Sequence, residues 1–200
     1  MQRARHAFEL ASAGRHVAMV SSGDPGVFAM AAAVLEALDE ARNEAHGSVW
    51  AAVELEIVPG VSAALATAAQ AGAPLGHDFC VLSLSDNLKP WELIERRLDA
   101  AAAAGFVIAL YNPVSRARPW QFGAAIERLR RHLPPETPVV LGRAVGRADE
   151  RVSVVTLAAA TMDADMATLV IVGSRETRVI ARSGRPPLVY TPRAAAEVSA

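Results

Sequence analysis

Four short polar segments carry most of the side chains in this 200-residue sequence that could bind a ligand or move a proton. They are 21–26 (SSGDPG), 59–63 (PGVSA), 84–90 (LSDNLKP) and 110–119 (LYNPVSRARP). Together they supply glycines, hydroxyls, carboxylates and guanidinium groups. Each lies at the end of an apolar run typical of a strand, and open α/β sheets bind ligands beyond the carboxyl ends of their strands. The four segments therefore predict a ligand cleft at one sheet edge, although a helix cap would also explain each segment taken singly.

The elements that would position these segments alternate along the chain. Strands are expected at 16–21, 52–58, 79–84, 106–111, 138–142, 151–157, 168–173 and 188–190. Helices are expected at 4–13, 26–42 and 62–71, and apolar residues recur at helical spacing from Trp91 to Ala102 and from Phe122 to Leu133. This order predicts an α/β protein with mainly parallel pairing in its first half.

A break in the pattern predicts two domains. Residues 72–77 (GAPLGH) contain two glycines and a proline and are expected to link them. We therefore expect an N-terminal α/β domain over 1–73 and a C-terminal α/β domain over 78–192. Residues 193–200 are expected to form a loose tail.

Composition excludes several classes of protein. Lys and Arg number 20 against 21 Asp and Glu, so the chain lacks the basic excess of a nucleic-acid-binding protein. The single cysteine, Cys80, excludes a disulfide framework, and the five histidines show no metal-ligand spacing. No apolar run reaches the roughly 18–20 residues of a membrane span. The sequence thus indicates a cytoplasmic protein without metal, membrane or nucleic-acid partner.

Standard catalytic motifs are also missing. The patterns GxxxxGK[ST], GxGxxG after a strand, and GxSxG do not occur, which argues against a phosphate cradle or a serine hydrolase.

Longer motifs point to a family. VSSGDPGVFAMA (20–31), VPGVSAALATAAQAGAPLGHDF (58–79), SLSDNLKPWE (83–92) and LYNPVSRARPWQF (110–122), in this order, resemble the tetrapyrrole methyltransferases of corrin biosynthesis. The resemblance implies a two-domain fold with S-adenosylmethionine in the cleft between the domains, and a homodimer. It implies methyl transfer to carbon 17 of precorrin-3B with contraction of the macrocycle. It also implies an opening strand and GxGPG-type loop before residue 3, so the first domain is expected to be N-terminally truncated and to bind the cofactor poorly.

The resemblance assigns cofactor contacts position by position. Ser22, Gly23 and Asp24 match a loop that lines the S-adenosylmethionine site, and Val27 matches a position whose backbone touches the cofactor. The remaining matched positions are Ser62, Ala63, Asn112 and Val145.

Substrate and catalytic roles follow from the chemistry that the resemblance implies. A precorrin carries acetate and propionate carboxylates, which guanidinium groups bind in bidentate fashion. We expect Ser85, Lys89, Arg116 and Arg118 to bind this substrate, with Arg143 and Arg147 as further candidates. Methyl transfer itself mainly needs positioning and a dry cleft. Ring contraction needs an acid or base, for which Asp86 is the first candidate and His77 the second.

Other functions stay open at this point. The chain could methylate another precorrin carbon, or it could be an inactive truncated subunit that binds tetrapyrrole, which the missing start favours. An unrelated flavodoxin-like nucleotide binder is a third class, and the missing phosphate motifs argue against it.

Overall fold

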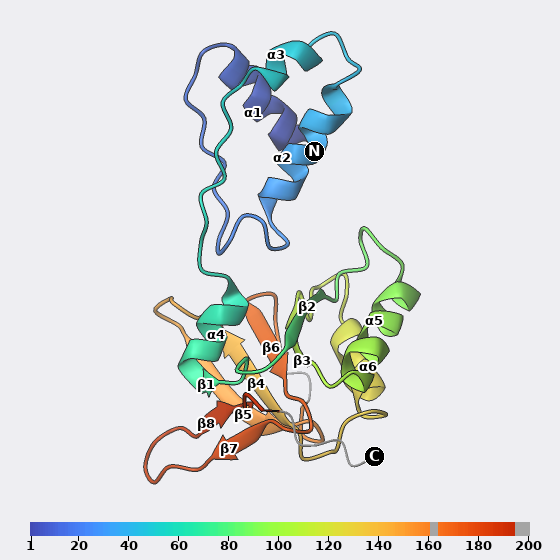
Figure 1. Ribbon diagram of the computed structural model, residues 1–200, viewed down its shortest axis with the longest axis vertical. Coiled ribbons are helices and arrows are strands. Elements are labelled where there is room, and N and C mark those ends of the chain that lie inside the picture. Colours follow the sequence, from blue (N-terminus) through green and yellow to red (C-terminus); the bar gives the residue numbers. More distant parts are fainter. Residues whose placement is uncertain (161–163, 195–200) are drawn as a thin grey trace. The chain divides into compact units, whose positions relative to one another are not determined.

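The computed structural model describes residues 1–160 and 164–194. Contacts divide the chain into two units, Met1–Ser62 and Ala63–Ala200, and each is described by itself (Figure 1). The division falls at the start of a helix, whereas the expected linker at 72–77 contributes a strand to the second unit. Most of the expected tail, 195–200, lies outside the described residues. No described helix has an apolar stretch long enough to cross a membrane.

The first unit is built from three helices. They are α1 (Gln2–Ser12), α2 (Met30–Ala41) and the short α3 (Gly47–Ala51). Phe8 of α1 stacks on Trp50 of α3 with ring centroids 5.2 Å apart, and both are buried with Val34 and Ala37 of α2. Apolar side chains from the three helices therefore form a small core, and the helices expected at 4–13 and 26–42 are present as α1 and α2.

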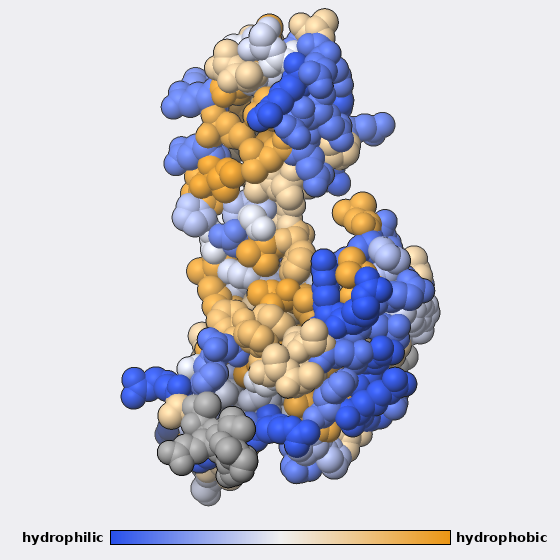
Figure 2. Space-filling view, turned by 45° about the vertical axis from the view of Figure 1, so that its right-hand side comes forward, coloured by the Kyte–Doolittle hydropathy of each residue, from blue (hydrophilic) through white to orange (hydrophobic). Residues whose placement is uncertain are grey.

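Two predicted strands of the first unit are wrong. Segments 16–21 and 52–58 are irregular and pair with no strand within the described residues. A strand requires a neighbour to bond its N–H and C=O groups, and apolar alternation alone does not supply one. Met19 and Val53 of these segments pack against the core of the first unit, whereas Val20 and Val58 stay 88% and 65% accessible. Orange side chains are visible on the surface of this unit (Figure 2).

Helix α2 also begins later than the expected residue 26. Phe28 has φ +53°, which lies in the left-handed region and breaks a right-handed helix. Residues 26–29 therefore form a turn, and the helix starts at Met30.

The second unit is a five-stranded sheet with helices on both faces. Its strands are β2 (Phe79–Ser83), β3 (Val107–Tyr111), β4 (Pro138–Arg143), β5 (Arg151–Thr156) and β6 (Thr168–Val172), in the order β2-β3-β6-β4-β5. Its helices are α4 (Ala63–Ala71), α5 (Trp91–Ala103) and α6 (Gln121–Leu129). A smaller sheet, ordered β1-β8-β7, joins β1 (Gly72–Ala73), β8 (Leu188–Tyr190) and β7 (Arg178–Ile180). Every strand predicted after residue 78 is thus present.

Pairing in the large sheet is mixed. Strands β2 and β3 are parallel, and the other three neighbouring pairs are antiparallel. The parallel pairing predicted for the first half is confirmed only between β2 and β3, because the two upstream strands do not form. Since β4 is antiparallel to β6, and β6 to β3, the strands β2, β3 and β4 all end at the same edge.

Both faces of the sheet are covered, which explains its apolar strands. In β3, Ile108 and Leu110 pack in one core cluster with α5 and α6, while Val107 and Ala109 pack in a second cluster with α4. Side chains alternate between the faces of a strand, so a strand covered on both sides is apolar throughout.

Candidate functional site

In the first unit, Asp24 holds two predicted cofactor loops together. Its carboxylate accepts hydrogen bonds from the backbone N–H of Gly26 at 2.8 Å and of Gly60 at 3.1 Å. A Cβ on Gly60 would lie 2.4 Å from the backbone oxygen of Gly23, so only glycine fits there. Gly23 has φ +76°, which likewise favours glycine. Apart from the buried Ser62, the residues of these loops are exposed or half-buried. Their backbone N–H and C=O groups can therefore bind a small polar ligand.

Ser22 and Val27 flank Asp24 in the same turn. The side chain of Ser22 is exposed, and the N–H of Val27 donates to the backbone oxygen of Asp24 at 3.2 Å. The N–H of Val27 is thereby used within the turn, which leaves its C=O as the group for an external contact.

In the second unit, the ends of β2, β3 and β4 bring several predicted residues to one sheet edge. Ser85 follows β2, Asn112 follows β3 and Val145 follows β4. Strand β6 lies between β3 and β4, so the ends of those two are about 10 Å apart. Ala63, the first residue of α4, is tied to this edge because the neighbouring Ala64 N–H donates to the Tyr111 hydroxyl at 3.0 Å. Ser62 is buried just before it.

Ser83 is the centre of the hydrogen bonds at this edge. Its Oγ accepts from Asn112 Nδ2 at 2.9 Å and from the N–H of Ser85 at 3.2 Å, and its side chain is buried. The loops after β2 and β3 are therefore bonded to each other. One of the two N–H groups on Nδ2 of Asn112 is used in this bond, so the amide can still offer its carbonyl oxygen and its second N–H to a ligand.

Backbone strain occurs beside the predicted cofactor positions. Among the described residues, three non-glycine residues have positive φ: Phe28 at +53°, Asn112 at +54° and Ala144 at +49°. Asn112 is itself a predicted contact, while Phe28 and Ala144 are chain neighbours of Val27 and Val145. Such backbone costs roughly 1–3 kcal/mol per residue and clusters at ligand sites. The strain supports the three positions independently of the sequence motifs.

The two candidates for proton transfer lie at different places. Asp86 follows β2 and accepts a hydrogen bond at 3.1 Å from Nε2 of Gln121, a side chain that is 1% exposed. His77 precedes β2, and its Nδ1 bonds the N–H of Asp78 at 2.7 Å. The five-residue strand between them spans about 17 Å, so the structure does not bring Asp86 and His77 together.

The candidate cations fall into two groups. Arg143 is paired with Asp149 at 2.7 Å and Asp165 at 2.9 Å, and these hydrogen-bonded carboxylates raise its pKa. Lys89, Arg116 and Arg118 form no ion pair with any residue that the structure describes. Burial, then the nearby charge of Arg97, lowers the pKa of Lys89. The unpaired group is therefore the one available to an anionic ligand.

A separate hollow of about 340 Å³ lies on the first unit and contains none of the predicted site residues. It is lined by Arg5, Glu9, Ser12, His46 and Trp50. Arg5 is bound by Glu44 at 2.9 Å and by Glu40 at 3.3 Å, so its charge is already neutralised. We assign these side chains to packing between α1, α2 and α3.

Two residues of the second unit were missed from the sequence. Gln121 could have been found, because it is a polar residue on the apolar face of α6 shared by Phe122 and Ala125. Ser83 gives a weaker signal, since a serine at the end of an apolar strand is common. Neither has a role that spacing alone reveals, because both act through hydrogen bonds between distant segments.

The described residues contain no group of three or more His, Cys, Asp or Glu that could hold a metal ion. The donor set at the sheet edge is instead made of amide, hydroxyl and backbone groups, which suits an organic ligand with several polar ends.

Comparisons with known proteins show the family of the chain. The family model of the tetrapyrrole (corrin/porphyrin) methylases matches residues 2–161. The chain is 62% identical to a precorrin-3B C(17)-methyltransferase from Sinorhizobium sp over 194 residues, which are 96% of this chain and 74% of that one. It is 41% identical to a probable cobalt-factor III C(17)-methyltransferase from Salmonella typhimurium, covering 96% of this chain and 75% of the relative. The crystal structure of the methyltransferase CobJ superposes with a TM-score of 0.86 at 50% identity, over 96% of this chain and 76% of that chain.

Proposed function

The chain belongs to the tetrapyrrole (corrin/porphyrin) methylases, and on that premise we propose that it methylates carbon 17 of precorrin-3B during cobalamin biosynthesis. The observation that carries this proposal is the 62% identity to a precorrin-3B C(17)-methyltransferase over 96% of the chain. The methyl group comes from S-adenosylmethionine, and the macrocycle contracts in the same reaction.

The metal-free substrate is favoured over a cobalt-containing one. Identity to the relative named for cobalt-factor III is 41%, against 62% for the one named for precorrin-3B, at equal coverage of this chain. Both names place the methyl group on carbon 17, so the choice concerns the metal and not the carbon.

The chain's own residues bind and orient the methyl donor. S-adenosylmethionine supplies an activated methyl group on a sulfonium. Within the first unit, the family motifs match donor contacts at Ser22, Gly23, Asp24 and the backbone of Val27. Within the second unit, they match Ala63, Asn112 and the backbone near Val145, and Ser62, directly before α4, is a further matched position. The positive φ of Phe28, Asn112 and Ala144 supports this assignment, because strained backbone is retained where a ligand uses it. The reaction needs no nucleophilic side chain, since the enzyme aligns the two reactants and excludes water.

Asp86 is the group that moves a proton during ring contraction. Its carboxylate is half-buried and is held by the amide of Gln121, which fixes its orientation. His77 stays the second candidate. His77 and Asp86 lie at opposite ends of β2, so the two would not act on the same atom.

The carboxylates of the precorrin are bound by Lys89, Arg116 and Arg118, with the hydroxyl of Ser85 beside Ser83. Charge-assisted hydrogen bonds to carboxylates are about twice as strong as neutral ones. Arg143 is excluded from this role here, because Asp149 and Asp165 already bind it. We further infer that the enzyme acts in the cytoplasm and that it is a homodimer. Sedimentation of the purified chain would test the homodimer.

The test is methyl transfer to two substrates in parallel. Purified chain is incubated with S-adenosylmethionine carrying a labelled methyl group and with either precorrin-3B or cobalt-factor III. We expect mass spectrometry to show one added methyl group on precorrin-3B, and NMR to place it on carbon 17 of a contracted ring. A label on another carbon would overturn the assignment. Tetrapyrrole binding without any transfer would instead support the inactive-subunit alternative.

A further inference from the structure

The loops after β2 and β3 carry an apolar surface that the roles assigned above do not use. Trp120 is 48% exposed and Leu88 is 100% exposed. The ring of Trp120 meets that of Trp91 edge-on, with centroids 4.9 Å apart, and Trp91 packs against the core of the second unit. The indole of Trp120 is therefore supported from behind while part of it remains open to solvent.

These two loops lie side by side. Gln121, next to Trp120, donates to Asp86 of the other loop at 3.1 Å, and the tryptophan pair makes a second contact between them. Leu88 and Lys89 come from the first loop, and Trp120 from the second. These two contacts hold the loops that carry Leu88, Lys89 and Trp120 next to each other.

Arg118, in the loop after β3, carries a buried hydrogen-bond donor that no described residue pairs. The backbone of Ser115 and Arg118 forms two hydrogen bonds, at 3.0 and 3.1 Å, which make the turn that carries the guanidinium. Its Nη1 is buried and has no hydrogen-bond partner among the described residues. Leaving a buried donor unpaired is costly, more so on a charged group. An acceptor from outside the described chain would remove that cost.

We propose that Trp120 is the surface on which the tetrapyrrole macrocycle lies, with Lys89 and Arg118 binding carboxylates at its rim. This inference rests on the tetrapyrrole substrate proposed above. The macrocycle is flat and apolar at its centre and anionic at its edge. An indole presents a large rigid apolar area, and aromatic rings stack with an energy beyond that of buried area alone. Lys89 and Arg118 come from the same two loops as that indole, and their positive charge is complementary to the anionic rim.

The test measures binding of uroporphyrin, a stable tetrapyrrole octacarboxylate, to the full chain by the shift of its main absorption band. We expect Trp120→Ala to weaken uroporphyrin binding by about tenfold or more, corresponding to about 1.4 kcal/mol. Trp120→Phe keeps an aromatic face and should retain most of the affinity. The matched control is Phe79→Ala, because Phe79 is a 39% exposed aromatic residue at the start of β2, on the opposite sheet edge. This control should bind as the unchanged chain does.

A second pair of variants tests the rim. Arg118→Gln should weaken uroporphyrin binding, whereas Arg175→Gln should not, since Arg175 is bound to the backbone oxygen of His132 instead. S-adenosylmethionine affinity, measured by calorimetry, should stay within about twofold for Trp120→Ala, which also shows that this variant is folded.

The outcomes separate this inference from the proposed function. If the unchanged chain methylates precorrin-3B and Trp120→Ala binds uroporphyrin equally well, Trp120 is not the macrocycle surface and the proposed function stands. If Trp120→Ala changes the sedimentation coefficient and not the uroporphyrin affinity, the surface is a contact between copies and the inference is wrong. If the unchanged chain binds neither tetrapyrrole, both the inference and the proposed function fail.

Discussion

At the scale of single residues, Asp24 shows how one side chain serves structure and binding together. Both of its carboxylate oxygens accept backbone N–H groups, from Gly26 and Gly60. These bonds hold the turn around Gly23 against the segment that leads to Ser62. Asp24 therefore holds the predicted cofactor loops in shape and also places a negative charge among them.

We predict that Asp24→Ala weakens S-adenosylmethionine binding. A hydrogen bond to a charged group contributes roughly 1.5–3 kcal/mol, so the affinity should fall about tenfold or more. Calorimetric titration measures it. The control is Asp39→Ala, because the Asp39 side chain is 71% exposed and pairs with Arg42 on the same helix end. A folded Asp24→Ala chain with unchanged affinity would remove Asp24 from the cofactor site.

At the scale of elements, α4 packs closely against β4, where Thr67 of the helix contacts Gly142 of the strand. A Cβ on Gly142 would lie 2.3 Å from the hydroxyl and 2.4 Å from the methyl of Thr67, whose side chain is buried. Helix α4 begins with Ala63 and is bonded to Tyr111 through Ala64. A shift of α4 would therefore reach the sheet edge where the predicted ligand contacts gather.

We predict that Gly142→Ala lowers the free energy of unfolding by about 1–3 kcal/mol, because added volume in a packed core forces neighbours to move. The double variant Gly142→Ala with Thr67→Ala should recover part of that loss, since the three atoms nearest to the added Cβ all belong to Thr67. Urea unfolding of the three chains tests the coupling. Additive losses in the double variant would show that the clash with Thr67 does not control the position of α4.

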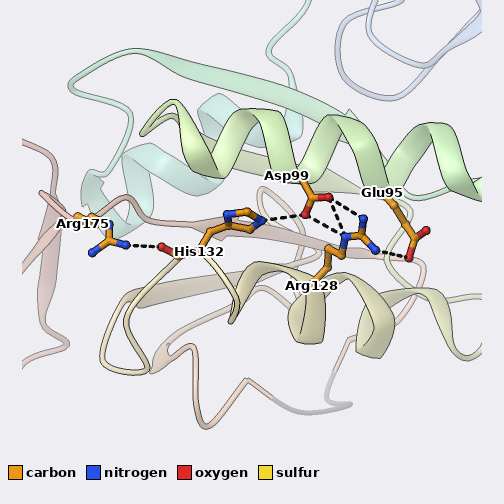
Figure 3. Close-up of polar contacts among 5 residues, drawn as sticks. All are labelled: Glu95, Asp99, Arg128, His132 and Arg175. Carbon is orange, nitrogen blue, oxygen red and sulfur yellow. Dashed lines mark hydrogen bonds and ion pairs between the residues drawn. The ribbon is translucent and has the colours of Figure 1, made fainter.

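An ion-pair network joins α5 to α6 (Figure 3). Asp99 accepts from Arg128 at 2.6 and 2.9 Å and from His132 at 2.9 Å, while Glu95 pairs with Arg128 at 3.2 Å. Arg175 adds a bond to the backbone oxygen of His132 at 2.7 Å. The hydrogen bonds from Arg128, followed by the one from His132, lower the pKa of Asp99.

This network predicts a pH-dependent effect of Asp99→Asn. The folded state holds Asp99 ionised at a lower pH than the unfolded state does. The stabilisation is therefore complete above the ordinary pKa of 3.8 and is lost as the pH falls through the lower folded pKa. We expect Asp99→Asn to cost about 1 kcal/mol at neutral pH, since these side chains are partly solvated, and less at pH values below about 4. Urea unfolding at both pH values measures the difference. Glu127→Gln is the control on an exposed carboxylate, and an equal cost of Asp99→Asn at both pH values would contradict the mechanism.

At the scale of the whole molecule, the two units differ in how their backbones are bonded. The second unit has a continuous ladder of five strands covered on both faces. In the first unit, segments 16–21 and 52–58 have no ladder within the described residues. Local stability follows such bonding, because exposed and unpaired backbone opens at little cost.

We predict that hydrogen exchange separates the two units. Amides of β3 and β6 should exchange slowest, and those of 16–21 and 52–58 should exchange within the fastest class. The measurement is repeated over a range of protein concentrations. Protection of 16–21 that rises with concentration would show pairing between copies, which supports the proposed homodimer. Protection at every concentration would contradict the lack of a ladder in segments 16–21 and 52–58 of the structure.

Sequence alone determined the family, the α/β fold class and the activity class of a cobalamin-pathway methyltransferase. These follow from ordered motifs such as 20–31 and 110–122, and the family model and the relatives confirm them. Strands buried on both faces, such as 107–111 and 168–172, were also predictable, because a short unbroken apolar run is typical of such a strand.

Tertiary structure alone decided what depends on neighbours distant in the sequence. Segments 16–21 and 52–58 read as strands but form none, because a strand exists only through its partner. The bonds of Ser83 to Asn112 and of Gln121 to Asp86 join residues 29 and 35 positions apart, and no local pattern marks them. His77 and Asp86 lie close in the sequence, yet the length of β2 keeps them apart. Spacing along the chain predicts which residues share an element, whereas only packing decides which elements meet.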